Sequence, residues 1–332
     1  MPKNLDVVGL GNALMDVVVM IPSNDIIDRH GLTVGVMHPV DNQRWQEIYD
    51  DIGDLSKDIQ TGGSCANTIA SLGLLGANVS YCSQVGNDTF GMMYKQQFQD
   101  ACGRHHLLTS HTVATGKCLS LVDKDAERTM LTDLGAAVAL DSIDHYKEAV
   151  AQAKVLYLTG YLMLGEESTQ HMLNLIAVAK ENGTKVGFDV ADPFVIDIVK
   201  DQMFELIKEH VDIIFLNEKE SVALCGGTPE SALEMLQGFC EIVVVKLGGK
   251  GSMACRGDER VTADIYPANL IDTTGAGDSY ASGFLYGYVN DWTLIHSVKL
   301  GSKIASKVVS QTGAVLRDSS MLAQCVSEVL SE

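Results

Sequence analysis

The chain has 332 residues, of which 46% are hydrophobic and 20% are charged, a balance typical of a globular protein with a large core. Its 43 acidic and 24 basic residues give a formal net charge of −19, which repels nucleic acid and anionic membrane surfaces. We therefore expect neither class of partner. A phosphate-bearing ligand fits this sequence only if backbone amides, a metal ion or a few local cations offset the charge.

The start of the chain has no basic segment followed by a long apolar core, so it does not resemble a secretory signal. No window approaches about 18 uninterrupted apolar residues, the length that an ordinary membrane-spanning helix requires. These two patterns predict a cytoplasmic protein.

Short β-rich runs alternate with longer segments of helical period, which predicts βα units. The fold class expected is α/β: a doubly wound, mainly parallel sheet with helices on both faces. Residues 242–245 are apolar at every position, as a strand buried on both faces requires, and we expect them at the sheet centre. The runs are residues 7–10, 79–83, 155–159, 186–189, 213–216 and 242–247.

Two segments, residues 16–40 and about 107–131, break this alternation because β-branched residues occur there without long helices between them. Residues 17–20 and 117–122 have the composition of strands, and residues 123–128 that of a turn. The interpretation is a small β-sheet lid, built from both segments and continuous with a single domain over residues 1–332. An exposed sheet of this kind often pairs with a second copy, so a homodimer through the lid is an expected arrangement.

A glycine-rich turn at residues 272–279 carries the strongest chemical signal. Gly275, Ala276 and Gly277 allow a tight backbone turn, and the segment that follows has helical length up to Asn290. The free amides and positive dipole end of that helix suit a phosphoryl group. Asp278, in the first turn, would accept the proton of an attacking hydroxyl. Read alone, the same residues also fit a plain turn with a helix-capping carboxylate.

Residues 272–278, Asp-Thr-Thr-Gly-Ala-Gly-Asp, resemble the C-terminal motif of the ribokinase, or PfkB, family of carbohydrate and nucleoside kinases. Residues 62–70, Gly-Gly-Ser-Cys-Ala-Asn-Thr-Ile-Ala, resemble a second motif of that family. The similarity runs from about residue 7 to residue 317. It implies a ribokinase-like domain with a lid, a phosphotransferase activity that moves the γ-phosphoryl group of ATP to an alcohol of a small substrate, and Mg²⁺ as the metal of the nucleotide.

The acceptor site is expected near the first strand. A dinucleotide-binding fingerprint would need a glycine where Leu14 stands, so that alternative is weak. The resemblance implies that Asp16, with Asn12 beside it, binds sugar hydroxyls, although a solvated aspartate at a strand end is the plainer interpretation.

The second motif is expected to complete this acceptor site. Gly62 and Gly63 allow a substrate to approach the backbone closely. By resemblance Asn67 binds a sugar hydroxyl, and helix capping is its alternative role.

The nucleotide site is expected at Asn217 and Glu220, which resemble the family's Asn-x-x-Glu pattern, with Glu220 acting on Mg²⁺ through water. Without the family they form an ordinary capping box. The loop after residue 245 has hairpin chemistry and is not a Walker A loop, because Gly251 follows Lys250. Asp272 resembles a position near a K⁺ site. By resemblance, the residues that line ATP are Lys246, Gly248, Gly249, Gly251, Thr273 and the segment from Ala305 to Gly313.

Within the family, the chain is most similar to adenosine kinases at residues 9–16 and 190–194. Leu134, Tyr161 and Phe194 are the expected apolar walls for a purine. Leu162 departs from the aromatic residue expected beside Tyr161, which weakens purine stacking. Two alternatives stay open: a sugar kinase for ribose or fructose, and a non-catalytic nucleotide-binding regulator.

Overall fold

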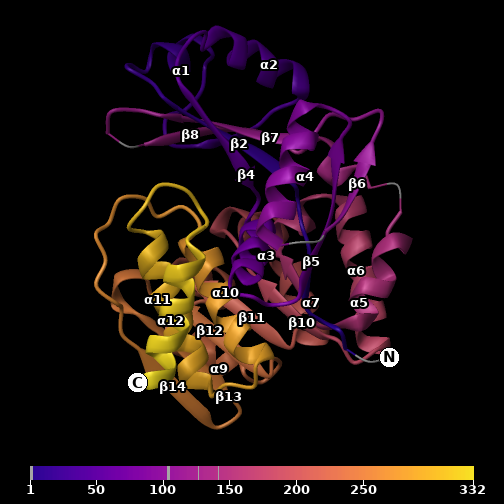
Figure 1. Cartoon of the computed structure of the whole chain (residues 1–332), viewed down its shortest axis with the longest axis vertical. Helices are drawn as coiled ribbons and strands as arrows, with labels where there is room; N and C mark the ends of the chain where they lie inside the picture. Colours follow the sequence, from indigo (N-terminus) through magenta and orange to yellow (C-terminus); the bar gives the residue numbers. More distant parts are fainter. Residues whose placement is uncertain (1–2, 103–104, 126, 141) are drawn as a thin grey trace.

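The computed structural model describes residues 3–102, 105–125, 127–140 and 142–332 (Figure 1). Its main feature is a nine-stranded sheet whose neighbours run parallel from β6 to β12, whereas β13 and β14 add an antiparallel edge. In spatial order the strands are β14 (Glu259–Ala263), β13 (Ser252–Arg256), β12 (Ile242–Lys246), β11 (Ile213–Asn217), β10 (Lys185–Asp189), β9 (Ala153–Thr159), β1 (Leu5–Leu10), β5 (Val79–Gly86) and β6 (His106–Ser110).

Helices cover both faces of this sheet, each over its own apolar core, so the expected α/β class is confirmed (Figure 1). One face carries α3 (Ser64–Leu74), α4 (Thr89–Cys102), α10 (Ala276–Val289) and α11 (Leu294–Val308), with α12 (Ser319–Ser331) packed on α11. The other carries α5 (Asp144–Gln152), α6 (Glu166–Glu181), α7 (Pro193–His210), α8 (Glu218–Cys225) and α9 (Pro229–Leu236). Three short 3₁₀ helices each follow a strand: η1 (Gly135–Val138) follows β8, η2 (Gly160–Leu164) follows β9 and η3 (Gly248–Lys250) follows β12.

The apolar strand β12 is buried on both faces, as expected. Val243 and Val245 pack in one core, and Ile242 and Val244 pack in the other. Its expected position at the sheet centre is wrong, because the β13–β14 hairpin extends the sheet only two strands beyond it.

A second, five-stranded sheet lies above the carboxyl ends of the large one (Figure 1). The core beneath its outer face is formed by α1 (Asp25–Arg29), α2 (Asn42–Asp51) and strand residues such as Val17 and Leu119, which pack around Trp45. The strand order is β3 (Met37–Pro39), β8 (Arg128–Asp133), β7 (Gly116–Val122), β2 (Leu14–Met20) and β4 (Lys57–Gly62). We call this sheet with α1 and α2 the lid.

The strands of the lid differ in two places from the segments expected for it. Strand β6 pairs with β5 in the large sheet, although it falls within 107–131. Strand β4 belongs to the lid, although it lies outside 16–40. Strand β4 was not predicted because Ile59 is the only large apolar residue in Lys57–Gly62. The expected turn at 123–128 includes Ala126, which lies outside the described residues. The homodimer expected through pairing of two lids stays a prediction.

The chain changes winding direction between β1 and β9. From β1 it continues to β5 and β6 with helices on one face, and from β9 it continues to β10, β11 and β12 with helices on the other. In open α/β sheets, ligands bind at the carboxyl ends of the strands beside such a reversal. The fold therefore places a binding crevice beneath the lid. Within the described residues, no helix is long and apolar enough to cross a membrane.

Candidate active site

The glycine-rich turn enters α10 with two free backbone donors. Gly275 has φ 71°, and a Cβ at this position would lie 2.4 Å from the Ala314 carbonyl oxygen, so glycine is required there. The Ala276 amide donates to the Thr273 carbonyl. Among the described residues, no acceptor is found for the amides of Gly277 and Asp278. Unpaired amides at a helix start form an anion site.

The carboxylate of Asp278 is held by the first turn of α3. Ser64 Oγ donates to one carboxylate oxygen at 2.6 Å, and Asn67 Nδ2 donates to the other at 2.9 Å. Burial raises the pKa of Asp278 to about 6, against the opposing effect of these two hydrogen bonds. The side chain of Asn67 therefore orients Asp278, the expected base, and does not cap α3.

The residues expected to bind the phosphoryl acceptor lie close together, in β2, at the end of β4 and in the loop after β1. A Cβ on Gly62 would lie 2.1 Å from Asp16 Oδ2, and a Cβ on Gly63, which has φ 97°, would lie 2.2 Å from the Asn12 carbonyl oxygen. Burial, with a smaller effect from the charge of Asp278, raises the pKa of Asp16 to about 7, although the charge of Arg128 opposes this. Asn12 Oδ1 is buried without a hydrogen-bond partner among the described residues. These groups offer oxygen acceptors to a hydroxyl-bearing ligand.

A cavity of about 720 Å³ is lined by Asp278 and by residues of the glycine-rich turn. It brings together thirteen residues expected in the site: Tyr161, Asn217, Glu220, Lys246, Gly248, Gly249, Gly251, Thr273, Gly275, Ala276, Gly277, Asp278 and Ala305. Its lining also includes the largely apolar side chains that an adenine ring requires: Ile265, Tyr266, Ala268, Leu270 and Val309.

Three adjacent strands end at this cavity with polar side chains. Asp189, Asn217 and Lys246 are the last residues of β10, β11 and β12. Lys246 Nζ lies 2.8 Å from Asp189 Oδ2, and both side chains are almost fully buried. The plainer interpretation of Asn217 and Glu220 also holds, because they form a complete capping box at the start of α8.

Glu220 suits a magnesium ion held through water. Its carboxylate lines the cavity, and its two oxygens accept hydrogen bonds from the backbone and side-chain nitrogens of Asn217. Burial raises the pKa of Glu220 to about 7, while the charge of Lys246 lowers it. Mg²⁺ usually keeps several waters and is held by one or two carboxylates with substrate phosphates, so the single carboxylate of Glu220 is compatible with this role.

The carboxylate of Asp272 is held by protein donors, and a potassium ion near this residue stays a prediction. Oδ1 accepts from the amide and hydroxyl of Thr274 and from Arg128 at 3.0 Å, and Oδ2 accepts from the Gly313 amide at 3.2 Å. Four donors, one of them a guanidinium, therefore fix the carboxylate of Asp272. Arg128 belongs to β8, so this ion pair joins the lid to the turn that holds Asp278.

Several expected residues lie away from the large cavity. Phe194 is 44% exposed at the start of α7, and Leu134 precedes η1 with its carbonyl against Gly116. Gly313 bonds Asp272 and lies against Gln60 of the lid. Of the expected purine wall of Leu134, Tyr161 and Phe194, Tyr161 lines this cavity, and the wall itself stays a prediction.

Sequence reasoning missed Asp189, Ser64 and Arg128 as site residues. A position at the carboxyl end of an expected parallel strand could have revealed Asp189. Ser64 lies inside a motif that was recognised. Arg128 and the apolar wall at residues 265–270 carried no local signal, because they approach the turn only in three dimensions.

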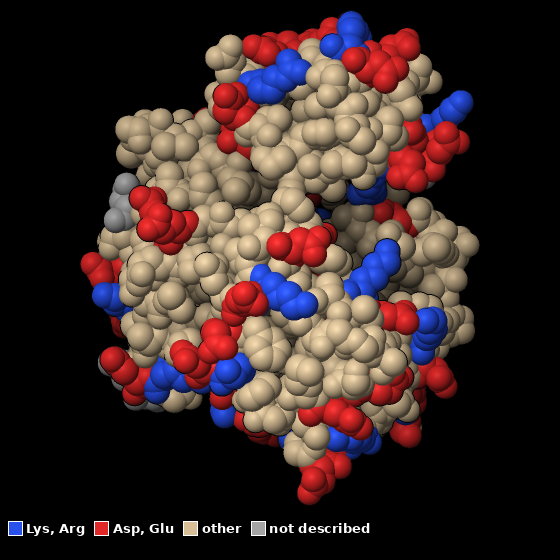
Figure 2. Space-filling model, turned by 180° about the vertical axis from the view of Figure 1, so that it is seen from behind, with Lys and Arg blue, Asp and Glu red and all other residues tan. Residues whose placement is uncertain are grey.

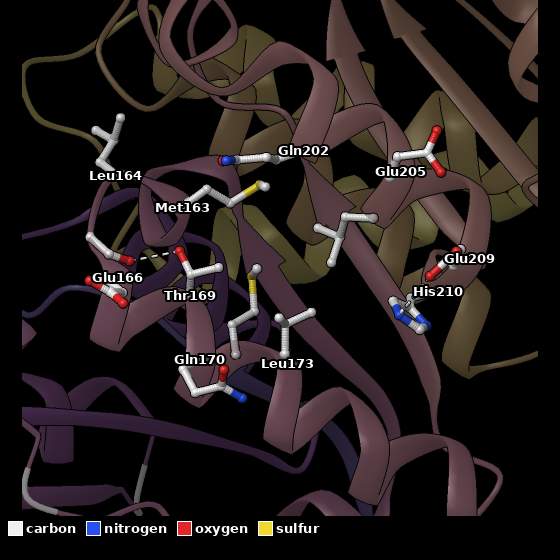
Figure 3. Close-up of a pocket in the computed structure, with 13 residues that line it drawn as sticks. Met163, Leu164, Glu166, Thr169, Gln170, Leu173, Gln202, Glu205, Glu209 and His210 are labelled. Carbon is white, nitrogen blue, oxygen red and sulfur yellow. Dashed lines mark hydrogen bonds and ion pairs between the residues drawn. The ribbon is translucent and has the colours of Figure 1, made fainter.

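Acidic and basic side chains are interspersed over the face in Figure 2, without a broad basic patch. A second cavity of about 520 Å³ is lined by residues of η2, α6 and α7. Figure 3 shows its lining, with Met163 beside Gln202 and Glu209 beside His210. No lining residue of this second cavity belongs to the turn that holds Asp278.

A helix start with bare amides, a neighbouring carboxylate and a lid over the carboxyl ends of a parallel sheet define the class of small-molecule kinases with a ribokinase-like fold. A sequence profile of the pfkB family carbohydrate kinases matches residues 56–320, and the chain belongs to this family, whose members phosphorylate hydroxyls of sugars or nucleosides with ATP.

Two solved structures resemble almost the whole chain. The adenosine kinase from Sinorhizobium meliloti is 31% identical with a TM-score of 0.86, covering 98% of this chain and 99% of that one. A probable sugar kinase from Rhizobium etli CFN 42 is 30% identical with a TM-score of 0.88, covering 99% and 100%. A 5-dehydro-2-deoxygluconokinase from Geobacillus thermodenitrificans is 28% identical over 263 residues, 75% of this chain and 78% of that protein.

Proposed function

We propose that this protein transfers the γ-phosphoryl group of ATP to the 5′-hydroxyl of adenosine. The observation that carries the proposal is the position of Asp278: it shares one helix turn with two unpaired amides and lines a cavity that also has apolar lining residues. A base and an anion site that meet at one point are what phosphoryl transfer to an alcohol requires.

In the proposed reaction, the acceptor oxygen attacks the γ-phosphorus while its proton passes to the Asp278 carboxylate. The bond between the γ-phosphorus and the β,γ-bridging oxygen breaks, and ADP leaves with that electron pair. The amides of Gly277 and Asp278 stabilise the negative charge on the transferring group. Bound Mg²⁺, held through water by Glu220, would neutralise charge on the phosphates. The lid excludes water that would otherwise hydrolyse ATP.

The charges around the acceptor site favour a neutral acceptor. Among the described residues, Arg128 is the cation that acts on Asp16, and it is already bonded to Asp272. A sugar acid beside Asp16 would therefore bring a further negative charge to a carboxylate whose cation is already paired. This argues against a gluconate-type acceptor, whereas adenosine and neutral sugars are both compatible.

The similarity to the Sinorhizobium meliloti adenosine kinase along the whole chain supports adenosine. Leu162 in η2, where an aromatic was expected, and the exposed Phe194 favour the alternative, a kinase for a neutral sugar such as ribose or fructose. A purine gains from aromatic stacking, which a free sugar does not need.

The experiment is a panel of acceptors with ADP release measured for each: adenosine, inosine, guanosine, ribose, fructose and 5-dehydro-2-deoxygluconate. We expect the highest kcat/KM for adenosine. Activity confined to ribose or fructose would replace adenosine by a sugar, and preference for the gluconate would contradict the charge argument. ATP binding without turnover on the panel would favour the non-catalytic regulator.

A further inference from the structure

The ion pair between Lys246 and Asp189 lies directly beside the helix start that holds Asp278. A Cβ built on Gly277 would come within 3.3 Å of Lys246 Nζ, so the ammonium group lies next to the free amide of the anion site. Both members of the pair line the same cavity as Gly277 and Asp278. The cation is therefore placed where a terminal phosphate would meet the helix.

Sheet geometry brings this pair together. β10, β11 and β12 are consecutive parallel neighbours, so Asp189 and Lys246 extend from the same edge of the sheet on either side of β11. Asp189 is anchored on its second oxygen as well, because the Ala191 amide donates to Oδ1 at 3.1 Å. Ala191 adopts φ 80°, a conformation that disfavours a residue with a side chain and that concentrates at functional sites.

The charge of Lys246 is secured by its surroundings. Burial works to lower the pKa of Lys246, but the carboxylates of Asp189 and Glu220 outweigh it, and the pKa is raised. A permanent cation in a buried cavity of an acidic protein is suited to bind an anion.

We propose that Lys246 binds the transferred γ-phosphoryl group of ATP, and that Asp189 is a positioning residue that holds the ammonium beside Gly277. This inference rests on the proposed phosphoryl transfer but not on which acceptor is used. The ammonium donates to a γ-phosphate oxygen while Asp278 takes the acceptor's proton. The ammonium group of Lys246 neither gains nor loses a proton during this step.

Nucleotide affinity tests the contact without any acceptor. Calorimetric titration compares the Mg²⁺ complexes of β,γ-imido-ATP and ADP in the wild type, Lys246→Met and Lys246→Arg. Loss of a charge-assisted hydrogen bond predicts that Lys246→Met binds imido-ATP about 10- to 100-fold more weakly, with ADP affinity within about threefold of wild type. Lys246→Arg should recover part of the loss. Equal affinities in wild type and Lys246→Met, or equal weakening for both nucleotides, would overturn the proposal.

Stability separates this role from a purely structural one. Removing one member of a buried ion pair destabilises the fold, whereas the neutral pair Lys246→Met with Asp189→Asn should recover much of the thermal stability. We expect this double variant to keep a kcat about 10²- to 10³-fold below wild type, the range for loss of one transition-state donor. Asp189→Asn alone should bind imido-ATP within about threefold of wild type, with kcat about tenfold lower.

A matched control uses the ion pair of Lys154 and Asp6, 2.9 Å apart at the amino ends of β9 and β1. Its neutral double variant should retain wild-type kcat and nucleotide affinities. Recovery of wild-type kcat by the Lys246→Met, Asp189→Asn double variant would show that the pair serves folding alone. Because the titrations contain no acceptor, an error about adenosine would leave their outcome unchanged.

Discussion

At the scale of single residues, Asp278 lies between opposing influences on its pKa. Burial raises the pKa, the donors Ser64 and Asn67 lower it, and the result is about 6. Below this pH the carboxyl carries a proton and does not accept one from an alcohol. Above it, the base is ionised and ready.

The pH dependence of kcat/KM should report this group in the free enzyme together with Asp16 and Glu220, whose pKa values are raised to about 7. We expect a plateau above about pH 8, and a fall below about pH 7 that reaches at least tenfold per unit below about pH 6. Steady-state rates from pH 4.5 to 8.5, with substrates that do not titrate in the range, provide the measurement. A flat profile down to pH 4.5 would be inconsistent with a buried base.

Asp16 makes a prediction about stability. Its pKa is raised to about 7 in the folded protein, so ionisation opposes folding, and this group's contribution to stability declines as the pH rises from about 4 to about 7. Asp16→Asn removes that penalty and should stabilise the protein at pH 8 by about 1 kcal/mol, or roughly 2 °C, with little change at pH 4. Activity should fall, because the acceptor loses a carboxylate ligand.

Thermal unfolding at the two pH values checks this expectation. Asp58→Asn, an exposed position on β4 of the same lid, is the control and should change the midpoint little at either pH. Destabilisation of Asp16→Asn at pH 8 would show that this carboxylate supports the fold.

At the scale of elements, the ion pair between Arg128 of β8 and Asp272 joins the lid to the catalytic turn. Arg128→Gln should loosen the closed lid, lower kcat/KM for the acceptor about tenfold and increase ATP hydrolysis in the absence of acceptor. Coupled assays for ADP with and without acceptor measure both effects.

Arg29→Gln is the matched control, because Arg29 bonds Asp51 at 3.2 Å within the lid itself. Its kinetics should equal those of the wild type. If Arg128→Gln also behaved as wild type, the lid would be held by contacts other than this ion pair.

At the scale of the whole molecule, the sequence predicted what local pattern determines. The apolar runs became strands of the large sheet, and the glycine motif became the start of α10 beside a cavity. Contacts between residues far apart in the sequence were not predicted. Arg128 meets Asp272 across 144 positions, and Lys246 meets Asp189 across 57. Such pairs depend on strand order and on the position of the lid, which no short window contains.

The net charge of −19 left room for a phosphate ligand only with local compensation. The structure supplies candidates for this compensating positive charge: two free amides at the start of α10, and Lys246.

Strand β4 was not predicted because its composition is polar, and half-buried lid strands need few apolar residues.

The central claim is that Asp278 is the base for phosphoryl transfer, and Asp278→Asn tests it most directly. Single-turnover transfer of radiolabelled γ-phosphate to the preferred acceptor is compared with the wild type, and imido-ATP affinity is measured on the same samples. We predict a rate lower by about 10²- to 10⁴-fold, with imido-ATP affinity within about threefold of wild type. An unchanged transfer rate would contradict the account.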